Sequence, residues 1–216
     1  MKELKSQSPK YLELINSYKQ VKKAIAHFNI SNLDQARAIC EVAEELKQPV
    51  IIGVSEGERE YIGVAMVRSV VDELNQEYSV PIFLNADHTY TLEKVMEAVE
   101  AGYDSVIVDG AKLPYEENVE LVKNAVDMVR EYELKNGKKI LVEAELGYIG
   151  QSSSLNKILP EGVSVANLTT KELAQDFILR TGIDMFAPAI GNVHGMLVDA
   201  PEPKLHIDRL KEIISV

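Results

Sequence analysis

Short apolar runs alternate with longer amphipathic stretches along most of the chain. Six runs rich in Val, Ile, Leu and Phe have the length of buried β-strands, and apolar residues at helical spacing follow each of them. The predicted strands are 24–30, 49–56, 81–88, 105–110, 139–147 and 185–191. The predicted helices are 10–23, 33–46, 63–78, 91–101, 114–134, 169–181 and 207–216, with a Gly-bearing loop after residue 56 and a long polar loop over 148–168. This alternation is typical of parallel βαβ units.

Polar residues stand at the carboxyl ends of all six predicted strands. They are Asn29, Ser55, Asp87 with His88, Asp109, Glu145, and Asn192 with His194. An open doubly wound sheet concentrates its site at one switch point, whereas a (β/α)₈ barrel collects residues from many strands around one mouth. We therefore expect an α/β fold of the TIM (β/α)₈ barrel type. A barrel of this kind needs about 250 residues, so we expect only about six of its eight βα units here, over residues 24–216, after a helical leader over 1–23.

Composition narrows the class of protein. The net charge of −11 argues against nucleic-acid binding, which needs a basic surface. No run approaches the roughly 18 apolar residues of a membrane span, and the first residues lack the apolar stretch of an export signal. The single cysteine, Cys40, lies on an apolar helix face, which favours a core residue in a reducing compartment. We expect a cytoplasmic protein without a membrane or nucleic-acid partner.

The strand ends carry the residue types of a divalent metal site. His88 and His194 offer imidazole nitrogens, and Asp109 and Glu145 offer oxygens. Asp87, next to a predicted ligand, is left for proton transfer. The alternative is that the carboxylates cap the following helices and that His194 binds a loop carbonyl. Of the other two histidines, His27 is predicted to be packed within a strand and His206 to be solvated.

Four segments, in this order, carry a resemblance to a known family. They are FNISNLDQARAICEVAEELKQPVIIGVSEGEREYIG, PIFLNADHTYTLEKVMEAVEAGYDSVIVDGAKLPYEENV, VEAELGYIG, and AIGNVHG followed by EPKL. From residue 24 onward the chain resembles the class II, metal-dependent fructose-bisphosphate aldolases and their tagatose-bisphosphate relatives. The resemblance implies reversible cleavage of fructose 1,6-bisphosphate to dihydroxyacetone phosphate and glyceraldehyde 3-phosphate, in glycolysis and gluconeogenesis.

The resemblance also implies roles for the residues at the predicted barrel mouth. Asp87 corresponds to the general acid/base at the hydroxyl of the bond that is cleaved. His88 and His194 correspond to ligands of a catalytic Zn²⁺. Asp109 and Glu145 correspond to an alternative or second metal position, for a further divalent or a monovalent cation.

For the substrate, the resemblance implies that Asn29 and Ser55 lie near the triose-phosphate part and that Gly195 belongs to a phosphate-binding loop. A phosphorylated ketose or triose is therefore the expected ligand. Such a metal enzyme needs no Schiff-base lysine, since a Lewis acid stabilises the enediolate. The resemblance also implies a homodimer or homo-oligomer.

The sequence departs from the family at three places. The family's third zinc histidine lies in an H-G-G-S-G segment that this sequence does not contain. Serines 152–154 occupy the part of the loop where the family carries a Glu, and Glu161 is the nearest substitute. Val198 replaces a frequent Lys. Three readings follow: a fructose-bisphosphate aldolase, a tagatose-bisphosphate aldolase, or an inactive barrel fragment that acts as a binding partner.

Overall fold

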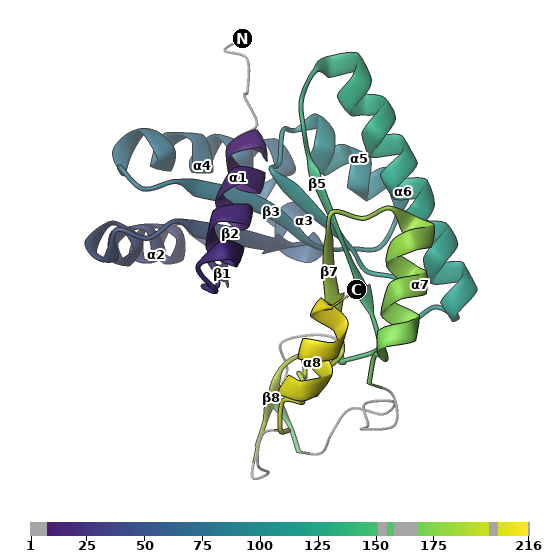
Figure 1. The fold of residues 1–216 in the computed structure, drawn as a ribbon. Coiled ribbons are helices and arrows are strands. Elements are labelled where there is room, and N and C mark those ends of the chain that lie inside the picture. The colour runs from purple at the N-terminus through teal and green to yellow at the C-terminus, as the bar shows by residue number, and fades with distance from the viewer. Residues whose placement is uncertain (1–7, 151–154, 158–167, 199–202, 216) are drawn as a thin grey trace. The chain divides into compact units, whose positions relative to one another are not determined.

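The computed structural model describes residues 8–150, 155–157, 168–198 and 203–215, and the chain forms two compact units (Figure 1). Unit 1 comprises Met1–Val108 and Asn124–Glu143, and unit 2 comprises Asp109–Lys123 and Ala144–Val216. The predicted boundary at residue 23 falls inside unit 1, between its first helix and its first strand, and stays a prediction. Among the described helices, none has both the length and the hydropathy that a membrane crossing requires.

Unit 1 contains a parallel sheet with a helix after each strand. Its elements are α1 (Ser8–Gln20), β1 (Ala26–Asn29), α2 (Leu33–Leu46), β2 (Val50–Ser55), α3 (Glu56–Ile62), α4 (Val64–Glu77), β3 (Ile82–Thr89), α5 (Leu92–Glu100) and β4 (Ser105–Val108). β1 pairs with β2, β2 with β3 and β3 with β4, all parallel. The second half of α6 (Tyr115–Asn136) and the start of β5 (Leu141–Leu146) also belong to this unit.

The core of unit 1 lies between this sheet and its helices. β2 and β3 are buried along nearly their whole length, and α2 and α4 supply small and branched side chains to the same core. α1 covers β3, because the ring of Tyr11 stacks on that of Phe83 with 4.5 Å between centroids. The predicted leader helix therefore packs as part of the unit.

Unit 2 contains the end of β5 and the later elements. These are β6 (Leu155–Asn156), α7 (Lys171–Thr181), β7 (Met185–Pro188), β8 (Met196–Leu197) and α8 (Ile207–Ile214). β7 follows β5 in the sheet, and β6 pairs with β8 in a separate parallel pair. Thr169 joins β5 to the segment after β7: its hydroxyl donates to the Leu146 carbonyl and accepts from the Ala189 amide.

The predicted α/β fold with six strands is confirmed. The larger sheet has the order β1-β2-β3-β4-β5-β7, which is the order of the six predicted strands along the chain. The predicted helices 33–46, 91–101 and 169–181 are confirmed, with observed starts at Leu33, Leu92 and Lys171. Their N-caps are Asn32, Thr91 and Thr170, whose side chains accept the backbone N–H three residues later. The long loop over 148–168 contains β6, while its serines at 152–154 and Glu161 lie outside the described residues.

Two local predictions differ from the structure. The predicted Gly-bearing loop after β2 is a helix, α3, capped by the hydroxyl of Ser55, which accepts from the Glu58 amide. Ser55 and Glu58 form the Ser-x-x-Glu pattern of a capping box, so the signal was present in the sequence. His27 was predicted to be packed within its strand, whereas β1 is exposed along its length at the end of the sheet order. Its ring does lie against Gly53 of β2, where an added Cβ would come within 2.1 Å of Nε2.

Cys40 behaves as the predicted core residue, since its side chain is fully buried in α2. Burial raises the pKa of the Cys40 thiol to about 11. Only the thiolate reacts with alkylating reagents, so at pH 8 we expect labelling to be at least about 100-fold slower in the native protein than in urea. Mass spectrometry of iodoacetamide-treated samples measures the two rates. Equal rates would contradict the burial of this thiol.

Candidate functional site

The carboxyl end of β3 carries an irregularity that sets the directions of two site residues. The register between β3 and β4 shifts between Ala86 and Thr89, as in a β-bulge. Within it His88 has φ of 46°, a left-handed conformation that is uncommon outside glycine and costs free energy. Asp87 and His88 therefore do not simply alternate across the pleat, because the bulge re-aims both side chains.

Asp87 is held by a hydrogen bond from the end of the first strand. Its side chain is buried, and Asn29 Nδ2 donates to Asp87 Oδ2 at 2.6 Å. The same carboxylate oxygen lies 4.0 Å from His88 Nε2. The structure thus brings Asn29, at the end of β1, together with Asp87 and His88 at the end of β3.

Asp109 and Glu145 are carried by the next two strands. Asp109 directly follows β4, is buried, and its Oδ1 accepts from the Ala111 amide at 3.1 Å. Glu145 lies in β5 and is buried as well. Asn118 Nδ2 donates to the Glu145 carbonyl at 3.0 Å, and a Cβ on Gly110 would come within 2.2 Å of the Asn118 side-chain oxygen. The amide of Asn118 therefore supports the backbone next to both carboxylates.

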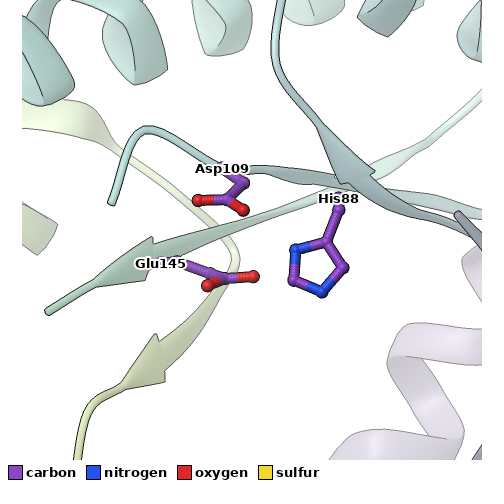
Figure 2. A group of neighbouring side chains, drawn as sticks. All are labelled: His88, Asp109 and Glu145. Carbon is purple, nitrogen blue, oxygen red and sulfur yellow. The ribbon is translucent and has the colours of Figure 1, made fainter. Parts of the chain in front are cut away.

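The described residues include one group with metal-ligand character, and it consists of His88, Asp109 and Glu145. One ligand atom from each lies within 4.8 Å of the others. Figure 2 shows the two carboxylates and the imidazole facing a common space. Ligands of a single zinc ion, at bond lengths of about 2.0–2.2 Å, stand about 3–4 Å apart, so the three residues fit a divalent cation after small side-chain movements.

The remaining predicted site residues lie outside this group, in the loop between β7 and β8 and at the end of β2. His194 is not a member of this group; it lies before β8, and its backbone N–H donates to the Ile149 carbonyl. Gly195 follows with φ of 91°, a conformation that favours glycine. Ser55 ends β2 opposite Asp87 in the β2–β3 register. Their predicted roles toward metal and substrate stay predictions.

Comparison with known proteins decides the family. The family model described as fructose-bisphosphate aldolase class-II matches residues 9–216. The chain is 38% identical over 206 residues to a fructose-bisphosphate aldolase of Geobacillus stearothermophilus, covering 93% of this chain and 67% of the relative. A fructose-bisphosphate aldolase of Staphylococcus aureus is 36% identical over the same share of each chain.

This chain belongs to the class II fructose-bisphosphate aldolase family. The family consists of lyases that depend on a metal and act on phosphorylated sugars, so the predicted enzyme class is confirmed. The chain spans about two thirds of the length of the curated relatives that it matches.

Solved structures agree with the family assignment. The YdjI aldolase from Escherichia coli K12 superposes with a TM-score of 0.76 at 30% identity, over 94% of this chain and 67% of that one. The fructose-bisphosphate aldolase from Campylobacter jejuni shares the fold, with a TM-score of 0.69 at 22% identity, over 98% of this chain and 65% of that one. The sheet of this family member is therefore part of the barrel-like fold of aldolases.

Sequence reasoning missed two buried residues that support this site. Arg59 lies in α3, where the sequence pattern predicts a loop, and Asn118 lies in the second turn of α6. The capping box at Ser55 was the signal for α3. No pattern in the sequence identifies Asn118, because its partners are backbone groups of β5 and a glycine outside its own helix.

Proposed function

We propose that this protein catalyses zinc-dependent, reversible cleavage of fructose 1,6-bisphosphate to dihydroxyacetone phosphate and glyceraldehyde 3-phosphate. The observation that carries the proposal is the group of His88, Asp109 and Glu145 at successive strands, with Asp87 directly beside His88. Membership of the class II aldolase family supports the reaction. The names of the reported relatives favour fructose bisphosphate over tagatose bisphosphate and over an inactive binding fragment.

We assign His88, Asp109 and Glu145 as metal ligands in the proposed mechanism, with His194 as a further ligand. One imidazole and two carboxylates form a donor set that suits Zn²⁺ and also admits harder divalent cations. When bound, a divalent cation supplies a Lewis acid that stabilises the negative charge developing on the dihydroxyacetone half. Asp109 and Glu145 are both buried, as expected of oxygens that bind a cation and not bulk water.

Asp87 moves the proton in the proposed mechanism. In the cleavage direction its carboxylate accepts the proton of the C4 hydroxyl. The C4–O bond then becomes the aldehyde carbonyl, the C3–C4 bond breaks, and its electron pair stays on the dihydroxyacetone half. That half gains one proton at C3 before dihydroxyacetone phosphate leaves. Asn29, which donates to Asp87 Oδ2, holds this carboxylate in place and leaves Oδ1 for the substrate hydroxyl.

The substrate-binding part of the proposal rests on the ends of other strands. Asn29 and Ser55 are proposed to contact the triose-phosphate part, and the backbone at Gly195 to contact a phosphate. We further propose that the enzyme acts as a homodimer or homo-oligomer in the cytoplasm. The single cysteine of the sequence is consistent with a reducing compartment.

Replacement of a ligand is expected to abolish tight zinc binding. For His88→Ala, Asp109→Ala and Glu145→Ala we expect the zinc dissociation constant to rise by more than about 100-fold, because losing even a supporting partner costs 10–100-fold. Competition with a chromophoric chelator measures it, and His206→Ala serves as the matched control without an effect. Parallel assays of triose phosphate release should show loss of activity on chelation and recovery with Zn²⁺. Unchanged affinity in His88→Ala would contradict the ligand assignment.

A further inference from the structure

Arg59 is a buried cation whose hydrogen bonds converge on the end of β3. Its side chain is only 2% exposed. Nη1 donates to the backbone carbonyl of Val54 and, at 2.8 Å, to that of Asp87. Nη2 donates to Thr89 Oγ1 at 2.9 Å. Two of its three acceptors therefore belong to the residues immediately before and after His88.

These acceptors lie at the irregular end of β3, where the pairing with β4 is interrupted. The bulge takes the residues between Ala86 and Thr89 out of the regular ladder with β4, so backbone groups that face β4 there require other partners. His88 itself adopts the left-handed conformation, which persists only where the surroundings impose it. Arg59 supplies a donor to the carbonyl before His88 and a donor to the hydroxyl after it.

The helix that carries Arg59 makes a further contact with the same segment. Glu56, in the first turn of α3, accepts the backbone N–H of Tyr90 at 3.1 Å. α3 begins directly after β2, where Ser55 is paired with Asp87 in the register. Residues 87, 89 and 90 thus all form hydrogen bonds with side chains of the short helix α3, and His88 lies between them.

We propose that Arg59 is a positioning residue that holds the bulge of β3 and thereby aims the His88 imidazole at the metal; this rests on the proposed role of His88 as a ligand. Arg59 does not touch the substrate, because its guanidinium is buried against protein acceptors. Arginine is required at this position since its planar fork reaches several acceptors at once, whereas a lysine ammonium is a compact point charge.

A pair of matched substitutions tests the proposal. Arg59→Lys is expected to weaken Zn²⁺ binding by about 10–100-fold, the usual effect of losing a group that orients a ligand. Arg68→Lys is the control, because Arg68 is equally buried in unit 1 but binds Asp104 and Asp72 instead of the β3 end. It should change the zinc dissociation constant by less than about twofold. The visible spectrum of bound Co²⁺ should change in Arg59→Lys alone.

A second measurement separates positioning from general stability. Amide hydrogen exchange in the metal-free protein should accelerate at residues 87–90 in Arg59→Lys and stay unchanged there in Arg68→Lys. Thr89→Val, which removes one acceptor of Arg59, should show the same local acceleration to a smaller extent. If Arg59→Lys bound Zn²⁺ with native affinity while His88→Ala did not, this inference would be overturned and the ligand assignment would stand. If His88→Ala also bound normally, the proposed metal site itself would fail.

Discussion

Replacing Asp87 with Asn is expected to lower the turnover number for fructose 1,6-bisphosphate cleavage by about 10²–10⁴-fold, the usual contribution of a general acid/base. The amide keeps the size of the carboxylate but cannot accept the proton of the substrate hydroxyl. Zinc content should not change, because Asp87 is not a member of the His88, Asp109 and Glu145 group. A coupled assay of triose phosphate release measures turnover, and metal analysis measures zinc.

The control for this substitution is Asp208→Asn, an exposed aspartate in the first turn of α8. It should leave turnover within about twofold of the native value. Loss of zinc together with activity in Asp87→Asn would make Asp87 a ligand and not a proton carrier. A turnover number close to native would remove Asp87 from the mechanism altogether.

Replacing Asp104 with Ala is expected to lower the free energy of unfolding by about 3–5 kcal/mol. Asp104 is fully buried, pairs with Arg68 Nη1 at 3.1 Å and accepts the Leu84 amide at 2.8 Å. The substitution leaves the Arg68 guanidinium buried with Asp72 as its remaining ion-pair partner. A loss of this size is large beside the 5–15 kcal/mol that keeps a typical domain folded. Urea denaturation followed by circular dichroism measures it.

An exposed ion pair of the same unit provides the contrast. Arg37 and Glu77 approach to 2.9 Å but remain about half exposed, so Glu77→Ala should cost no more than about 1 kcal/mol. Equal losses for Asp104→Ala and Glu77→Ala would show that burial does not decide the strength of these pairs. The double variant Asp104→Leu with Arg68→Met should be more stable than Asp104→Ala, since no buried charge is then left uncompensated. It should stay below the native stability, because the Leu84 amide has lost its Asp104 acceptor.

Hydrophobic periodicity predicted the six strands of the larger sheet, because each strand had to bury an apolar run between helices. It also predicted the starts of the helices at 33, 91 and 169 to within two residues, since capping depends only on residues a few positions apart. It did not predict α3, because the glycine at position 57 was read as part of a loop although Ser55 and Glu58 had the spacing of a capping box.

The residues of the candidate site could be named from sequence because carboxyl ends of neighbouring parallel strands share one edge of the sheet. That rule brought His88, Asp109 and Glu145 into one hypothesis, and the structure groups these three. It also included His194, which the structure does not place in the group. Strand order predicts which strand ends share an edge of the sheet. It does not predict where a side chain lies on a loop such as the one between β7 and β8, which carries His194.

The sequence by itself therefore determined the alternating α/β architecture, the family and the identity of the polar residues at the strand ends. Only the tertiary structure decided how the end of β3 is shaped. The left-handed backbone of His88 depends on the register shift between β3 and β4. The support from Arg59 depends on a hydrogen bond to Thr89, 30 residues further along the chain. Such contacts arise when distant segments pack together, so the helix and strand propensities of short segments cannot predict them.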